Sequence, residues 1–200
     1  MTELAALGSP QTANTWKDHG APDQIFGVKV ADMKAILKRT KKDHALALQL
    51  WDTGNSDAQY LAALMADEKR IDVAMLDRWA RTATRYMLAE YSVAWVTAES
   101  GHGWTCGLRW IDDPSQMVAM AGWSSLGGHL AGTPDEQLDL AAIEALLDRV
   151  ATTIHAARSG AVGKVHVDMG DTACKVPCAP EYIEKVLARG PATKRKTFRC

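Results

Sequence analysis

Apolar residues along this chain recur at steps of three and four, which is the spacing of one face of an α-helix. The longest stripe covers about five helical turns of segment 139–157 and consists of Leu140, Ile143, Leu147, Val150 and Ile154. A second, shorter stripe is formed by Val30, Met33, Ile36 and Leu37. Each stripe predicts an amphipathic helix that buries one side against a neighbour.

Polar residues and glycines mark where the remaining helices should begin and end. Asp43 is suited to cap a helix that ends at Gly54, and Ser56 is suited to cap the next one, so a helical hairpin is expected here. The other expected helices are two short ones ending near Gly8 and Gly20 and four later ones at 72–84, 87–98, 103–111 and 115–130.

One segment, Lys164 to Asp168, reads as extended, and a single short strand cannot found a sheet. The expected fold class is therefore all-α. Helix pairs at roughly 35–45 residue spacing favour an α-solenoid of HEAT/ARM-like helical repeats, with a globular helical bundle as the alternative. We expect one repeat domain at 1–188 and a basic C-terminal tail at 189–200.

Composition narrows the function classes. The formal net charge of -1 and the pI near 6.6 exclude a globally basic nucleic-acid binder, but they allow a local basic face. Basic residues gather in the run Lys38 to Lys42 and at the C-terminal end. No apolar run is long enough to span a bilayer and no leader is recognisable, so a cytoplasmic protein with reduced thiols is expected.

The chain has seven tryptophans, and aromatic residues gather near its middle. Consecutive helices could project these side chains into one groove beside a carboxylate, although each could equally be core packing. The residues concerned are Trp79, Tyr86, Glu90, Tyr91, Trp95 and Trp104.

Metal and nucleotide chemistry have little support in the sequence. His166, Asp168, Cys174 and Cys178 are suitable zinc ligands, but three residues separate the two cysteines and no second pair follows at the expected spacing. Glycine-rich phosphate loops, zincin helices and nucleophile elbows are absent from the sequence. No cofactor or metal is predicted, and a small metal-linked or redox-linked protein stays a minor hypothesis.

Several segments of the chain form a recognisable series. They are Ile25-Phe26-Gly27-Val28-Lys29-Val30 with Met33-Lys34, then Ala45 to Trp51, then Asp57 to Leu64, and near the end Val167 to Gly170 and Cys174 to Pro177. In this order they resemble the DNA alkylation repair family of HEAT-like-repeat DNA glycosylases. The resemblance covers roughly residues 20 to 150 in order, and the ending is similar to a less characterised branch of the family.

The resemblance implies excision of alkylated purines such as 3-methyladenine and 7-methylguanine from duplex DNA held on a basic concave surface. The family's Trp-x-x-x-Asp element corresponds here to Glu90-Tyr91-Ser92-Val93-Ala94-Trp95, with Trp95 where the aspartate is expected. The nearest acid is Glu90. The family's groove arginine has no counterpart, because 116–123 contains no basic residue.

The primary hypothesis is a DNA-binding protein of this family. If it is catalytic, it is a glycosylase that hydrolyses the N-glycosidic bonds of alkylated purines. The candidate catalytic acids are Glu90 and Asp112, beside aromatic Tyr91 and Trp95. The candidate DNA contacts are Lys29, Lys34, Lys38, Trp123, Lys175, Lys194, Arg195 and Lys196. The alternative is a noncatalytic helical-repeat scaffold whose concave face binds a protein or nucleic acid.

Overall fold

The computed structural model describes residues 1–158, and the side chains of residues 1–153. Within this part the chain is helical and contains no β-strand. The helices are α1 (Thr2–Leu7), α2 (Pro10–Asp18), α3 (Val30–Thr40), α4 (His44–Asp52), α5 (Ser56–Met65), α6 (Val73–Thr82), α7 (Ala94–Glu99), α8 (Gly103–Trp110), α9 (Gln116–Gly132) and α10 (Leu140–Arg158). Three further segments are η1 (Glu68–Arg70), η2 (Leu88–Val93) and η3 (Asp135–Gln137).

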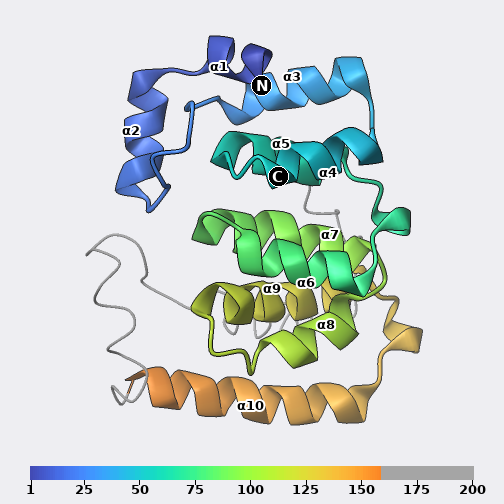
Figure 1. The fold of residues 1–200 in the computed structure, drawn as a ribbon. Helices are drawn as coiled ribbons and strands as arrows, with labels where there is room; N and C mark the ends of the chain where they lie inside the picture. The colour runs from blue at the N-terminus through green and yellow to red at the C-terminus, as the bar shows by residue number, and fades with distance from the viewer. Residues whose placement is uncertain (159–200) are drawn as a thin grey trace.

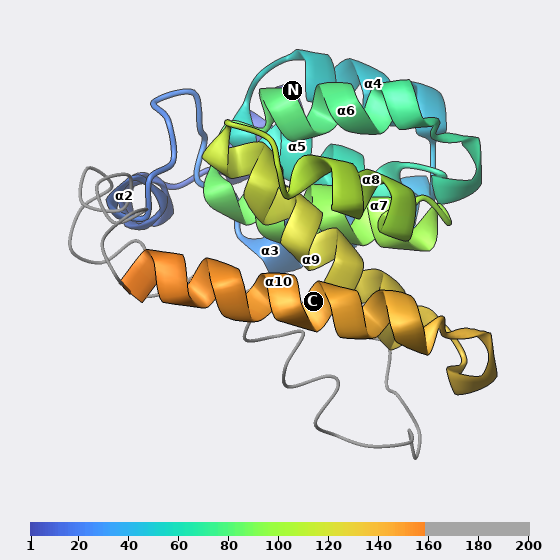
Figure 2. The same ribbon diagram turned by 90° about the horizontal axis from the view of Figure 1, so that it is seen from below.

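The helices stack in pairs that form two rows (Figure 1). We call α3, α5, η2 with α7, and α9 the odd row, in which each member packs on the next. Helices α4, α6 and α8 form the even row, which lies beside the odd row when the molecule is seen from below (Figure 2). Helix α10 crosses the end of the stack beneath α9 (Figure 1). The predicted all-α solenoid of HEAT-like repeats is confirmed.

Two apolar cores hold the stack together. The larger core runs from Leu4 to Ala121 through the odd and even rows and includes Trp51, Trp79 and Trp110. The smaller core joins α9 to α10 through Leu126, Leu146 and their neighbours. Ile143, Leu147 and Val150 of the stripe predicted in segment 139–157 face the end of the repeat stack. Leu140, at the start of α10, is instead 73% exposed.

The predicted helix boundaries are largely confirmed, with one change of cap. Asp43 caps α4, accepting a hydrogen bond from the Leu46 amide at 3.0 Å. Helix α5 is capped by Asn55 instead of the predicted Ser56, because the Asn55 side chain accepts from the amides of Asp57 and Ala58, both at 3.1 Å. Asparagine is among the preferred N-cap residues, and its side chain reaches two free amides here.

The helix predicted at 87–98 is wrong in one respect, because its first half is not α-helical. Segment η2 is a π-helix, whose hydrogen bonds join residues five apart, and it passes directly into α7. Glu90 and Tyr91 both lie in this segment. Such wide turns are rare, and they are found at functional sites more often than ordinary helix is.

Several predictions fall outside the described residues. These are the extended segment 164–168, the proposed metal ligands between His166 and Cys178, and the tail at 189–200. The division into a domain at 1–188 and a tail stays a prediction. None of the described helices is long and apolar enough to cross a membrane.

Candidate nucleic-acid interface

The arginines of the even row, and Arg149 of α10, are neutralised by aspartates from neighbouring repeats. Arg78 of α6 lies 3.0 Å from Asp52 of α4. Arg81 of α6 donates to Asp113, which follows α8, at 2.6 Å. The other two pairs are Arg109 with Asp77 and Arg149 with Asp112. The even row therefore presents its arginines as ion pairs, and its net positive charge is small.

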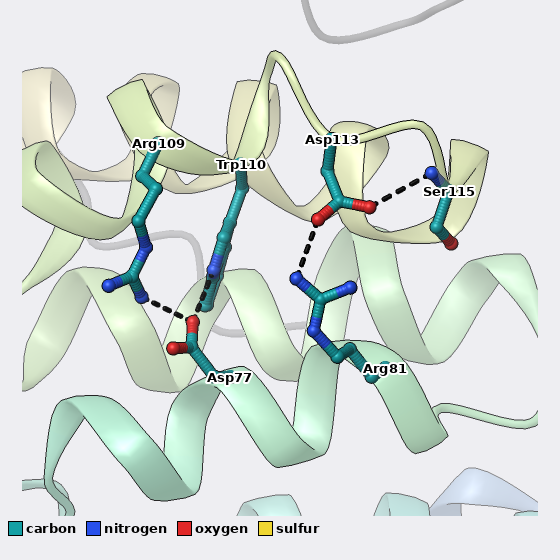
Figure 3. A network of polar contacts seen from close by, with 6 residues as sticks. All are labelled: Asp77, Arg81, Arg109, Trp110, Asp113 and Ser115. Atoms are coloured by element: carbon teal, nitrogen blue, oxygen red, sulfur yellow. Dashed lines mark hydrogen bonds and ion pairs between the residues drawn. The ribbon is translucent and has the colours of Figure 1, made fainter.

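Figure 3 shows the centre of this arrangement, where α6 faces α8 and the loop after it. Asp77 Oδ1 accepts from the indole Nε1 of buried Trp110 at 2.6 Å and also from Arg109. Asp113 accepts from Arg81 and from the Ser115 amide at 2.9 Å. The Arg81 hydrogen bond, with help from that amide, holds the pKa of Asp113 below its usual value.

Several lysines at the start of the odd row have no such partners, although Arg39 of α3 pairs with Glu3 at 2.5 Å and Lys42 pairs with Glu68. The predicted DNA contacts Lys29, Lys34 and Lys38 are exposed, and none forms an ion pair within the described part of the chain. Lys34 and Lys38 lie one turn apart on α3, so they share a helix face. Lys41, directly after α3, is also exposed and unpaired among the described residues. Together these lysines concentrate positive charge at one end of the stack.

The candidate catalytic residues of the odd row lie close together in sequence and differ in exposure. Tyr91 is 47% exposed, more than any other aromatic side chain in residues 1–153. Glu90 is half-buried and has no hydrogen bond or ion pair within the described chain, and burial raises its pKa. Trp95 is half-buried, and its indole Nε1 has no hydrogen-bond partner among the described residues.

The other candidate acid, Asp112, lies elsewhere. It follows α8 and pairs with Arg149 of α10 at 2.5 Å, whereas Glu90 belongs to η2. An acid that is already engaged by an arginine is a weaker candidate for stabilising a cationic sugar than an unpaired one. The structure thus does not bring the two candidate acids into one described cluster.

Two residues of the predicted shared aromatic groove, Trp79 and Trp104, pack in or against the apolar cores instead, and so does Trp123. Trp79 is wholly buried and stacks on Trp51, with ring centroids 4.1 Å apart, so it belongs to the core between α4 and α6. Trp104 packs against His129 in the smaller core. Trp123, predicted to contact DNA, is 6% exposed in that same core, which leaves almost no ring surface for a base.

One cavity of about 150 Å³ opens on the even row between α4 and α6. Its wall includes the Asp52–Arg78 pair and the side chain of Gln59. Both ends of the Gln59 amide are already used, by the Thr82 carbonyl and by Thr84. The cavity therefore presents no free polar group from Gln59 to a ligand.

The described residues do not form a metal site. Among them no three His, Cys, Asp or Glu side chains gather closely enough to hold an ion. Cys106 is a buried free thiol whose pKa is raised by burial. The remaining predicted contacts, Lys175, Lys194, Arg195 and Lys196, lie outside the described residues.

Sequence reasoning did not identify the paired aspartates of the even row. Their signal is complementary charge at repeat spacing, since both Asp77–Arg109 and Arg81–Asp113 are separated by 32 residues. Searching for acid and base at that separation would have indicated these two pairs, but not Arg78–Asp52 or Arg149–Asp112, which are 26 and 37 residues apart.

Comparisons with known proteins agree with this architecture. The model of the family described as DNA alkylation repair enzyme matches residues 1–163. The uncharacterized protein Lin0241 of Listeria innocua is 30% identical, over 94% of this chain and 96% of that protein. The uncharacterized protein Lmo0209 of Listeria monocytogenes is 29% identical over the same shares.

A solved structure is similar over its whole length. It is described as a new family of proteins related to the HEAT-like repeat DNA glycosylases with affinity for branched DNA structures. The TM-score is 0.78 at 29% identity, and the match covers 100% of this chain and 97% of that chain. The family model and the stacked helix pairs lead to the same conclusion, that this chain belongs to the DNA alkylation repair enzyme family.

Proposed function

We propose that this protein binds DNA through the side of the odd row that begins at α3, and that it favours branched DNA. The observation that carries the proposal is the unequal distribution of free positive charge. Lys29, Lys34 and Lys38 are exposed and unpaired within the described chain, whereas the described arginines of the even row are matched by aspartates.

DNA phosphates are attracted by cations whose charge is not already balanced, and each lysine that neutralises a phosphate releases a condensed counterion. An arginine held by an aspartate must lose that partner before it can do the same. The α3 end of the odd row is therefore the better phosphate surface, although the chain as a whole carries a net charge of -1.

Branched DNA is favoured for two reasons. The solved structure that is similar over the whole chain is described as having affinity for branched DNA structures. In addition, Tyr91 presents a 47% exposed ring from η2. At a branch point, base pairs end and bases lose a stacking neighbour, so an exposed aromatic ring can replace that neighbour.

The test is equilibrium binding to a four-way junction and to a linear duplex of equal length, over a range of salt concentrations. A Lys34→Gln/Lys38→Gln variant should bind both more weakly, and its salt slope should fall by roughly two. The matched control is Arg78→Gln/Arg149→Gln, which removes the same charge from ion-paired positions and should keep the wild-type slope. Equal loss in both variants would contradict the assigned surface, and no binding by wild type would favour a protein-binding scaffold.

A second candidate function is hydrolysis of the N-glycosidic bond of alkylated purines, favoured by the state of Glu90. This carboxyl group lies in a π-helical turn beside exposed Tyr91, and it has no partner in the described chain. An unpaired, half-buried carboxylate can stabilise positive charge on a sugar better than a solvated one, because water screens it less.

This candidate is tested by release of methylated purines from alkylated duplex DNA. Glu90→Gln should abolish release while DNA binding is retained, and Trp95→Ala should reduce it. Since burial raises the pKa of Glu90, the rate should rise with pH through that pKa as the carboxylate forms. Binding without release by wild type would leave a DNA-binding protein without glycosylase activity.

A further inference from the structure

Arg85 is a buried cation at the junction of three elements. It lies directly before the helix that contains η2, and only 4% of its surface is exposed. Its guanidinium carbon lies 4.7 Å from the centroid of the Trp16 ring, which belongs to α2. Asp57, in the first turn of α5, acts on it electrostatically, as do Tyr60 and Tyr86. The arginine therefore lies where α2 meets the first members of the odd row.

Two of the three guanidinium nitrogens of Arg85 lack the hydrogen bonds that a buried arginine normally has. Its Nε and Nη1 are buried with no hydrogen-bond partner in the described chain. Asp57 does not supply them, because its Oδ2 accepts from the amides of Phe26 and Gly27 at 2.8 and 2.9 Å, while its Oδ1 also lacks a partner. Asp57 thus balances the cation at a distance but does not bind it.

Burying the Arg85 charge with unpaired donors costs free energy in the folded protein. Burial lowers the pKa of Arg85, and the neighbouring Asp57 charge offsets that effect only in part. Buried polar groups are nearly always hydrogen-bonded, and those that are not require an explanation, such as strain, a catalytic role or a bound water or ion. Arg85 also presents its donors as a planar fork, a shape that matches phosphate oxygens.

Helix α2 covers Arg85 but is itself only lightly held. None of its nine residues, Pro10–Asp18, is buried. At its start the Ser9 amide bonds the Gly27 carbonyl at 3.2 Å, so this end is tied to the loop before α3. Further along, the described contact with Arg85 is the ring of Trp16, a half-buried residue. A helix that buries no side chain can move without opening a core.

We propose that Arg85 is a phosphate-binding residue of the DNA-binding surface, uncovered when α2 moves aside and its donors are taken over by a DNA phosphate. The inference rests on the proposed function, since it requires that DNA binds near the start of the odd row. The inference adds a phosphate contact from Arg85, a residue that is buried in the free protein. The ligand is the phosphodiester group, which accepts hydrogen bonds only and brings a negative charge into direct contact, whereas Asp57 acts on Arg85 without a hydrogen bond.

Three variants test this contact in equilibrium binding to the four-way junction over a range of salt concentrations. Arg85→Gln should bind at least tenfold more weakly and lower the salt slope by about one. Trp16→Leu weakens the cover but leaves the arginine, so its affinity should equal or exceed that of wild type. Arg149→Gln removes one charge from an ion-paired position and serves as the control, with unchanged binding expected.

Amide hydrogen exchange of the wild-type protein gives a second measurement that does not depend on the stability of any variant. On adding the four-way junction, the amides of α2 should exchange faster, while those of α3 and α5 exchange more slowly. Unchanged or slower exchange in α2 would overturn the inference, and so would wild-type affinity in folded Arg85→Gln. Either result is distinct from failure of the proposed function, in which wild type would not bind DNA.

Discussion

Replacing Asp77 with alanine should destabilise the protein more than the loss of an ion pair alone would. Asp77 Oδ1 accepts from Arg109 and from the indole Nε1 of Trp110 at 2.6 Å. The two bonds differ in environment. Arg109 and Asp77 side chains are 51% and 32% exposed, whereas Trp110 is 1% exposed.

The magnitude follows from that difference. An exposed ion pair contributes about 0.2–1 kcal/mol, but leaving a buried indole N–H without a partner costs about 1–3 kcal/mol. Asp77→Ala should therefore lower the free energy of unfolding by about 2–3 kcal/mol. For a chain of this length the corresponding fall in melting temperature is roughly 5–10 °C.

Urea titration at low and high salt separates the two contributions. Arg109→Met removes only the ion pair, so it should cost less than about 1 kcal/mol, and high salt should reduce that cost. Asp77→Asn keeps an oxygen for the indole and should resemble Arg109→Met. If Asp77→Ala cost no more than Arg109→Met, the Trp110 hydrogen bond would not be the main contribution, and the reasoning would fail.

Three further predictions concern stability. Because burial raises the pKa of Glu90, the folded state holds this proton more tightly than the unfolded chain, and the resulting stability is lost as pH rises through the folded pKa. Glu90→Gln should then unfold at higher urea than wild type at pH 7 and at equal urea below about pH 4. Gly107→Ala should cost about 1–3 kcal/mol in the same assay, since its Cβ would lie 2.6 Å from Leu126 Cγ. Gly132→Ala is the control, because no atom lies within 4 Å of the Cβ that it would add. Equal losses of stability in the two variants would exclude crowding at Gly107 as the cause. Gly27→Ala should destabilise more than Gly20→Ala, because both have φ near +80° but only Gly27 meets α2, with Ala13 N at 2.4 Å. Similar melting temperatures for the two variants would show that α2 shifts to accommodate the added methyl group without loss of stability.

The fold was predictable because its signals are local. The helix predicted in 139–157 and the cap at Asp43 depend on residues within a few turns of one another, and both are present in the structure. The π-helical turn was not predictable in this way. Hydrogen bonds between residues five apart change no residue type, so segment 87–98 reads as ordinary helix.

The candidate site was less predictable, since burial depends on contacts between distant segments. Trp79 and Tyr91 look alike in the sequence, but one stacks on Trp51 in the core and the other is 47% exposed. Arg85 carries no local signal at all. It is buried because α2 lies over it, and α2 is about seventy residues away along the chain.

The wide turn in η2 also affects how motifs are counted along this helix. A π-turn accommodates one residue more than an α-turn, so side chains five apart occupy the relation that side chains four apart have elsewhere. Glu90 lies within the turn and Trp95 lies two residues after it, five residues from Glu90. The spacing rules of an α-helix therefore misplace these two side chains relative to one another by one position. Deleting one residue from the turn would restore the α-helical phase and rotate Glu90 relative to Trp95 by roughly 100°.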